Sequence, residues 1–280
     1  MIFQPALGAG GLSGWRVLER TSASQQQTFE KSPVLQRNIN YFQENISKIT
    51  SAEDLVKDYR LLTVALGAFG LGDEINKRAL VQKMLEGGTE KSDSLANRFN
   101  DNRYKALVKA FGFGNITNGS SVLLSSFKED IITRYKSLEF ERAVGETDND
   151  MRIAMNFKRQ IGAIAESQSS ERTLWFQVMG QLPLRELIST ALNIPSGVAQ
   201  LNIDRQAEIF SDRAQQLLGN SSPEVFSDPE VVDNMIRRFF LFRQVENGPS
   251  VTTPGFAALS LLQSNGFGAA ANINLILSQL

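Results

Sequence analysis

Ser125 and Lys128 have the spacing of a serine nucleophile that is activated by a lysine. Residues three apart lie on one face of a helix, so the hydroxyl and the ammonium group would be neighbours. No S-D-N or K-T-G motif follows them to complete such a site. Because this spacing is common by chance, we interpret it as a chance match without nucleophilic chemistry.

The sequence contains no Cys and no His. This composition excludes disulfides, zinc sites with Cys or His ligands, and catalysis by a thiolate or an imidazole. Carboxylates occur in close pairs, Glu139 with Glu141 and Asp148 with Asp150. The second pair begins like a calcium loop, but Arg152 occupies its fifth position, so we expect Asp148 to cap a helix. We predict that the protein is not an enzyme; an enzyme using carboxylates, or a metal bound by them, is the third-ranked hypothesis.

A glycine-rich segment, residues 8–14, lies near the N-terminus. It lacks the G-x-G-x-x-G spacing of a dinucleotide-binding loop, and no predicted strand precedes it. The phosphate-binding pattern G-x-x-x-x-G-K-[ST] is absent from the chain. We therefore interpret the segment as a flexible leader and expect no cofactor and no metal.

The overall charge gives no reason to expect a nucleic-acid partner. The 280 residues carry a net charge of −1, and the pI is about 5.8, so no broad positive field attracts polyanions. No run of about 20 apolar residues spans a bilayer, and no cleavable signal peptide is recognisable. We predict a protein without a membrane span that stays in the cytoplasm or reaches the bacterial flagellum by export without a cleaved signal.

Apolar residues recur at helical spacing along most of the chain, and no convincing alternating strand pattern appears. Capping residues and glycines mark the helix ends. The pattern predicts an all-α, multi-helical fold with helices near residues 33–49, 50–69, 75–85, 101–111, 127–138, 148–164, 174–182, 183–194, 203–218 and 228–245.

Four short blocks recur in the same order about 127 residues apart, which indicates an internal repeat. The interpretation is two related helical halves packed together; the alternative is two unrelated helical runs. The blocks pair residues 60–67 with 186–193, 75–77 with 203–205, 99–101 with 226–228, and 109–111 with 237–239. The predicted organisation is an uncharged leader and first helix (1–32), a first half (33–113), a second half with inserted long helices (121–246), and an uncharged tail (247–280).

The chain also resembles a known family. The runs YFQENISKITSAEDL at 41–55, RLLTVALGAFGL at 60–71, GWR at 14–16 and TALNIP at 190–195 carry the resemblance, which extends over residues 12–262. They are similar to an uncharacterised alphaproteobacterial family of unknown function, family 1217, whose members are often encoded in flagellar gene clusters. The resemblance implies an all-helical protein linked to flagellar assembly or motility, and it implies no catalytic residues. The Asn-rich N-terminal signature of rod and hook proteins is absent, so we do not predict a rod or hook subunit.

Both ends of the chain lack charged side chains, from Met1 to Trp15 and from Asn247 to Leu280. Long uncharged apolar segments are rarely left in water by a monomer. Within the C-terminal tail, apolar and small residues follow heptad spacing, which suits packing on a partner helix. The candidate partner-contact residues are Leu259, Leu262, Ile273, Ile276 and Leu280. The alternative is that both ends fold back on the body of the same chain.

Together these features favour a non-catalytic structural or assembly protein associated with the bacterial flagellum. Its partners would be other flagellar or assembly proteins, with self-association through the termini as a further expectation. The alternative function is a cytoplasmic helical chaperone or regulator that binds an amphipathic helix of a flagellar export substrate.

Overall fold

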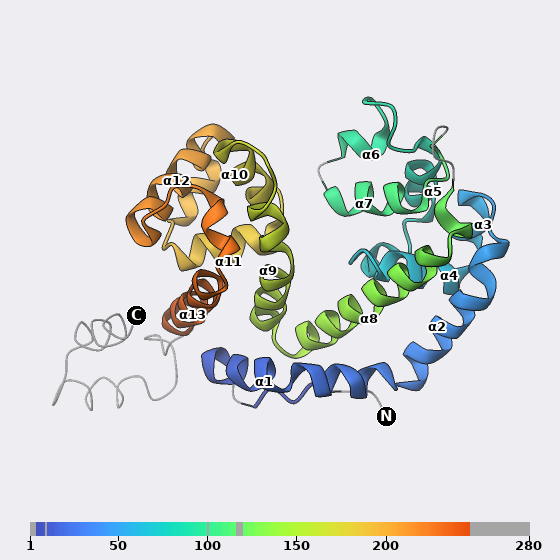
Figure 1. The fold of residues 1–280 in the computed structure, drawn as a ribbon, viewed down its shortest axis with the longest axis horizontal. Coiled ribbons are helices and arrows are strands. Elements are labelled where there is room, and N and C mark those ends of the chain that lie inside the picture. Colours follow the sequence, from blue (N-terminus) through green and yellow to red (C-terminus); the bar gives the residue numbers. More distant parts are fainter. Residues whose placement is uncertain (1–3, 9, 100, 116–119, 247–280) are drawn as a thin grey trace. The chain divides into compact units, whose positions relative to one another are not determined.

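The protein is all α-helical, as predicted (Figure 1). The computed structural model describes residues 4–8, 10–99, 101–115 and 120–246, and no strand occurs among them. The α-helices are α1 (Gly11–Glu30), α2 (Pro33–Asn45), α3 (Ala52–Lys57), α4 (Tyr59–Gly67), α5 (Arg78–Gly87), α6 (Leu95–Arg98), α7 (Asn102–Phe111), α8 (Ser125–Thr147), α9 (Asn149–Ala165), α10 (Glu171–Met179), α11 (Leu182–Ala191), α12 (Ile203–Leu218) and α13 (Pro229–Glu246). Short 3-10 turns are η1 (Ile46–Lys48), η2 (Gly72–Glu74), η3 (Ser121–Leu123), η4 (Ser196–Gln200) and η5 (Pro223–Ser227).

The helix expected over residues 50–69 is two helices, because Asp58 interrupts it. The backbone of Asp58 is extended (φ −86°, ψ 105°), and Asp58 Oδ1 accepts hydrogen bonds from the amides of Arg60 and Leu61, both at 3.0 Å. Its Oδ2 accepts the Tyr41 hydroxyl at 2.7 Å. Capping by a carboxylate stabilises a new helix start, so α3 ends at Lys57 and α4 begins at Tyr59. The cap of α3 is Ser51, so the helix begins at Ala52, two residues later than the predicted start at 50.

The C-terminal ends of α4 and α11 share one backbone device. Gly70 has φ +68° after α4, and Asn193 has φ +52° after α11. In each case the next amide bonds back across the last turn, Leu71 N to Leu66 O at 2.9 Å and Ile194 N to Ser189 O at 2.8 Å. A left-handed residue followed by this bond is a Schellman-type helix end. Gly70 thus ends the turn that follows α4, three residues after its last helical residue, Gly67.

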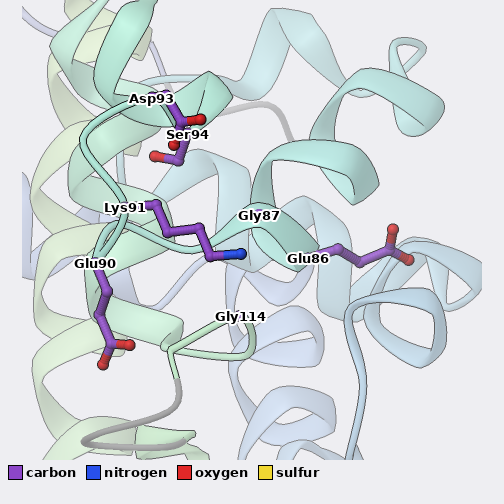
Figure 2. A pocket seen from close by; sticks show the side chains of 7 residues that line it. All are labelled: Glu86, Gly87, Glu90, Lys91, Asp93, Ser94 and Gly114. Carbon is purple, nitrogen blue, oxygen red and sulfur yellow. The ribbon is translucent and has the colours of Figure 1, made fainter.

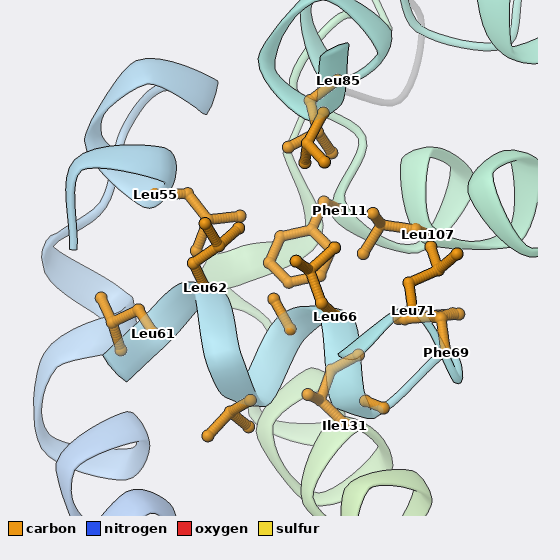
Figure 3. Packing of buried hydrophobic residues seen from close by; sticks show 14 of the residues in the cluster. Leu55, Leu61, Leu62, Leu66, Phe69, Leu71, Leu85, Leu107, Phe111 and Ile131 are labelled. Atoms are coloured by element: carbon orange, nitrogen blue, oxygen red, sulfur yellow. The ribbon is translucent and has the colours of Figure 1, made fainter. Parts of the chain in front are cut away.

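The described chain divides into two compact units, and unit 1 contains residues 4–7 and 17–152. In its core α4 contacts α2, α3 and α8. Figure 3 shows Leu62 and Leu66 of α4 beside Phe111 of α7, with Leu85 of α5 nearby. These side chains are at most 1% exposed.

Unit 2 contains residue 8, residues 10–16 and residues 153–246. Its core is built from α10, α11, α12, α13 and η5, with α11 packed along α13. Trp175 of α10 is 1% exposed. Its indole Nε1 donates to the Ser221 carbonyl at 2.9 Å, and its ring meets Phe210 and Phe226 at centroid distances of 5.6 and 6.5 Å.

The two compact units do not follow the predicted halves. The expected boundary at residues 114–120 falls inside unit 1, and the chain passes to unit 2 after Arg152, within α9. The reason is that α8, which was expected to begin the second half, packs on α4 and α2. The repeated blocks 60–67 and 186–193 lie in different units, in α4 and α11. Their common origin stays a prediction.

Candidate functional site

The residues with catalytic spacing have structural partners. Lys128, one turn after Ser125 at the start of α8, donates to the Gln43 carbonyl at 3.1 Å. The Glu139 carboxylate bonds to the Arg142 guanidinium at 2.8 Å. Asp148 Oδ1 accepts the Met151 amide at 3.1 Å, so Asp148 caps α9 as expected. These side chains hold helices in place.

A cluster around Tyr104, which we did not predict, has perturbed pKa values. The Tyr104 hydroxyl donates to Glu74 Oε2 at 2.6 Å, and Lys77 Nζ lies 2.7 Å from the same oxygen. Burial, and then the hydrogen bond to Glu74, raise the pKa of Tyr104. The hydrogen bonds from Lys77 and Tyr104 lower the pKa of Glu74. The Tyr104 phenol stays a neutral hydrogen-bond donor, and the Glu74 carboxylate stays charged. The cluster therefore links α7 to η2, and neither of these two groups is suited to accept a proton near neutral pH.

A shallow hollow of about 440 Å³ lies beside the end of α5 (Figure 2). Ser94, at its rim, is 9% exposed, and its Oγ has no hydrogen-bond partner in the described structure. Figure 2 shows the Glu86 side chain pointing away from Lys91, and Gln82 holds the Glu86 carboxylate at 2.7 Å. The other lining residues are Gly87, Glu90, Asp93 and Gly114. The charged side chains here are exposed rather than convergent, so the hollow does not resemble a built ligand site.

An exposed apolar surface lies at one end of the α11–α13 pair in unit 2. Leu182, the first residue of α11, is 77% exposed, and Val245, in the last turn of α13, is 49% exposed. Leu241 and Phe242 are half-buried and lie on the Val245 face of α13, because residues i, i+3 and i+4 share a face. We call Leu182, Leu241, Phe242 and Val245 the apolar end of unit 2.

Two arginines of α13 show why these residues lie together. Arg238 Nε donates to the carbonyl of Ala191 at the C-terminus of α11, at 2.9 Å. Arg243 forms an ion pair with Glu186, nearer the start of α11. The two helices therefore run antiparallel, and the last turn of α13 lies beside the first turn of α11. Leu182 and Val245 are consequently at the same end of the pair.

The arginines also shape the aromatic surface near the apolar end. The Arg238 guanidinium lies 5.5 Å from the centre of the Phe242 ring, and that of Arg243 lies 5.2 Å from the Phe239 ring. Such contacts are favourable electrostatically. Burial lowers the pKa of Arg238. The Phe242 ring is therefore in contact with the Arg238 guanidinium. On the same face of α13, one turn further along, lies the exposed Val245.

Most of the uncharged N-terminal segment is among the described residues, whereas the uncharged C-terminal tail is not. The predicted contact residues Leu259, Leu262, Ile273, Ile276 and Leu280 lie outside the described residues. The described part of the N-terminal segment packs on its own chain. The Ala6 amide and carbonyl bond to the Gln25 amide group at 2.8 and 3.0 Å, and Trp15, 6% exposed, stacks on Phe240 at 5.7 Å.

The chain matches the model of a known protein family. The model of the family described as "Protein of unknown function (DUF1217)" matches residues 68–232, more than half of the chain. The chain belongs to this family. The match runs from the end of α4 to the first turn of α13. It includes Leu182 and ends before Leu241, Phe242 and Val245.

A solved structure shares the fold. The crystal structure of protein AGR_C_984 from Agrobacterium tumefaciens superposes with a TM-score of 0.69 at 23% identity, covering 87% of this chain and 100% of that one. At this identity the likeness shows the fold alone. No curated protein matches the chain. No helix in the described ranges has the length and apolar character needed to cross a membrane.

The residues of the apolar end could have been found in the sequence. Our prediction considered contact residues only in the tail and missed them. The apolar residues 241, 242 and 245 occupy the i+3, i+4 and i+7 positions of the helix face that begins at Arg238. This face lies beside the buried face that contains Val232, Met235, Ile236, Phe239 and Phe240. A helix with two adjacent apolar faces indicates a second packing partner. Only the structure shows that one of these faces is exposed.

Proposed function

We propose that this protein is a non-catalytic structural or assembly protein of the bacterial flagellum, acting through protein contacts at the apolar end of unit 2 and the tail that follows it. The observation that carries the proposal is the exposure of Leu182 and Val245, directly before an uncharged segment of residues 247–280. Exposed apolar surface joined to an uncharged segment is typical of a protein interaction site.

The flagellar part of the proposal rests on the family resemblance of the runs at 14–16, 41–55, 60–71 and 190–195. The contact part rests on the chemistry of the tail, whose apolar residues Leu259, Leu262, Ile273 and Ile276 recur at the spacing of an interacting helix. Neither part needs a titratable group of unusual reactivity. This agrees with the structural partners found for Lys128, Glu139 and Asp148.

Cell fractionation tests where the protein acts. Cytoplasm, medium and purified basal bodies should be separated and each probed for the chain. We expect the protein in the basal-body or secreted fraction. A protein confined to the cytoplasm and recovered in complex with an export substrate would contradict the proposal and support the chaperone alternative.

A matched set of tail variants tests the contact itself. Deleting residues 249–280, or making the double substitution Ile273→Asp and Ile276→Asp, should abolish partner binding or swimming while helicity stays nearly unchanged. Ser278→Asp adds a charge to the same tail outside the predicted contact positions and should leave swimming normal. Normal swimming by the truncated protein would refute the proposed role of the tail.

A further inference from the structure

The apolar end of unit 2 leaves two apolar side chains largely in contact with solvent. Leu182 is 77% exposed and Val245 49% exposed, and burying such side chains is favourable in proportion to the apolar area removed from water. We propose that residues 256–280 of the same chain cover this apolar end in the free protein. This inference concerns the isolated molecule and is independent of the flagellar role.

The tail starts close to the apolar end. The tail begins at Asn247, immediately after α13 ends at Glu246. Pro249 cannot continue a helix, so the sequence favours a change of chain direction at this point. Residues 247–255 reach at most about 30 Å when extended, whereas the last six residues of α13 span about 9 Å. The tail is long enough to return over the apolar end.

The charges around the apolar end are the second argument. Arg243 forms ion pairs with Glu186 and with Glu246, the latter at 3.3 Å. Arg238 is bonded to the Ala191 carbonyl and lies over Phe242. Covering a charge that lacks a partner is costly, but these charges already have partners within unit 2. A segment without any charged side chain, such as residues 247–280, therefore fits this surface.

The other end of the chain supplies a parallel within the same unit. The N-terminal segment is also uncharged, and its Trp15 is buried against Phe240 of α13. Phe240 and Val245 belong to the same helix. α13 thus already packs against one uncharged terminus, and the apolar end offers a comparable surface to the other.

The size of the surface favours a segment of the same chain over a second copy. Four partly exposed side chains fall well short of the roughly 1,200 Å² that a stable interface between two molecules buries. An attached segment has an effective concentration of about a millimolar, so a small surface is enough to hold it. A second copy is therefore the outcome to be excluded by the experiment.

Hydrogen exchange on the full-length protein tests the proposal. Four forms should be compared at the same low concentration: the natural chain, the double variant Ile273→Asp/Ile276→Asp, the single variant Ser278→Asp, and Val245→Asp. We expect the amides of residues 241–246 to exchange at least about tenfold faster in the double variant and in Val245→Asp than in the natural chain or Ser278→Asp. Because the tail substitutions lie far from α13 in sequence, fraying caused by truncation cannot produce this difference.

Gln244→Asp is the matched control on the helix, since Gln244 is exposed beside Val245 but lies off the apolar face. It should exchange like the natural chain. Equal exchange in the natural chain and the double variant would overturn the proposal. Protection that appears only at concentrations where the measured molar mass doubles would also overturn it, in favour of a second copy. Normal swimming by a tail variant that has lost this protection would refute the proposed function and leave this inference standing.

Discussion

Units 1 and 2 each bury one short apolar helix, α4 and α11, but they secure its ends with residues that do not correspond. In unit 1 the start of α4 is capped by Asp58, and Arg103 of α7 donates to the Gly70 carbonyl after its end. In unit 2 the start of α11 has no side-chain cap, and Arg238 of α13 donates to the Ala191 carbonyl. Arg103 follows the capping Asp101 by two residues, whereas Arg238 follows Asp228 by ten.

In both units an arginine donates to a carbonyl at the C-terminal end of the short helix, but the arginine comes from a different position of the chain. Carbonyl groups at a helix C-terminus need donors, and an arginine from a packed helix supplies them. The predicted repeat aligns Asp101 with Asp228, and both accept an amide of the following helix, from Arg103 and Glu230. Similar positions thus keep the local cap, whereas the long-range contact depends on how each unit packs.

The aromatic residues allow the two units to be followed separately. All four tyrosines (Tyr41, Tyr59, Tyr104 and Tyr135) belong to unit 1, and both tryptophans (Trp15 and Trp175) belong to unit 2. Tyrosine near-UV signals therefore report on unit 1 and tryptophan fluorescence on unit 2. A substitution that affects one unit can thus be distinguished from one that affects both.

The largest effect is expected from removing a core ring in one unit. Phe111 is fully buried and meets Phe127 edge-to-face at 5.0 Å, so Phe111→Ala should lower the free energy of unfolding of unit 1 by about 3–5 kcal/mol. Urea unfolding should show an earlier tyrosine transition and an unchanged tryptophan transition. Phe157 of α9 is fully buried in unit 2 and meets Phe226 edge-to-face at 5.9 Å, so the matched variant Phe157→Ala should do the reverse. Coincident shifts of both probes in both variants would show that the units unfold as one.

Alkaline pH should weaken unit 1 through Tyr135. Burial raises the pKa of Tyr135 to about 12. The folded state therefore keeps this phenol neutral while the unfolded chain ionises near pH 10. The stabilising contribution is complete below pH 10 and is lost as pH rises from about 10 through about 12, at a cost of about 2–3 kcal/mol.

The measurement is the urea stability of unit 1 between pH 9 and pH 12. Tyr135→Phe should make the decline shallower without removing it, because burial also raises the pKa of Tyr104 in the same unit. The variant also removes the hydrogen bond that Asn38 donates to the hydroxyl at 3.1 Å. Tryptophan fluorescence of unit 2 is the internal control. A decline of equal steepness in Tyr135→Phe would contradict the prediction.

Adding one methyl group should have opposite effects in the two units. A Cβ on Gly67 would lie 2.6 Å from Cε2 of the buried Tyr135 ring, so Gly67→Ala should destabilise unit 1 by about 1–3 kcal/mol. A Cβ on Gly162 of α9 would meet no atom within 4 Å outside its own helix backbone, so Gly162→Ala should stabilise unit 2 by about 0.5–1 kcal/mol. Thermal unfolding of both variants checks the signs. Stabilisation by Gly67→Ala would mean that α8 is not held against α4.

The smallest effect is expected from the two corresponding caps. Asp101 Oδ1 accepts the Arg103 amide at 3.0 Å, and Asp228 Oδ1 accepts the Glu230 amide at 2.9 Å. Asp101→Ala and Asp228→Ala should each cost about 1 kcal/mol, in unit 1 and unit 2 respectively, as measured by urea unfolding. Asn at either position should retain most of the stability, because its oxygen accepts the same bond. A loss in Asp→Asn as large as in Asp→Ala would point to lost charge interactions rather than to the cap.

The fold class and most helix ends followed from local chemistry and could be predicted. The predicted ends at Gly112 and Leu218 were correct: Gly112 and Gly219 take left-handed φ values of +70° and +74° after α7 and α12. The carboxylate cap at Asp148 could also be predicted, because a cap bonds to amides only a few residues away. The break at Asp58 was missed although its capping bonds to the Arg60 and Leu61 amides are local; only the additional bond from Tyr41 of α2 comes from a residue distant in sequence. The candidate site was predicted on the tail alone, and the exposed residues beside it were missed.

By itself the sequence determined where most helices begin and end, because capping side chains and left-handed residues act within a few positions of the chain. It also determined which chemistries the protein lacks, since residues that are absent cannot react. Only the tertiary structure decided that α8 belongs to unit 1, that Gly67 must stay small beneath Tyr135, and that Leu182 and Val245 are exposed at the same end of the α11–α13 pair. Those outcomes depend on which apolar faces pair, and faces of similar composition are distinguished only by three-dimensional packing.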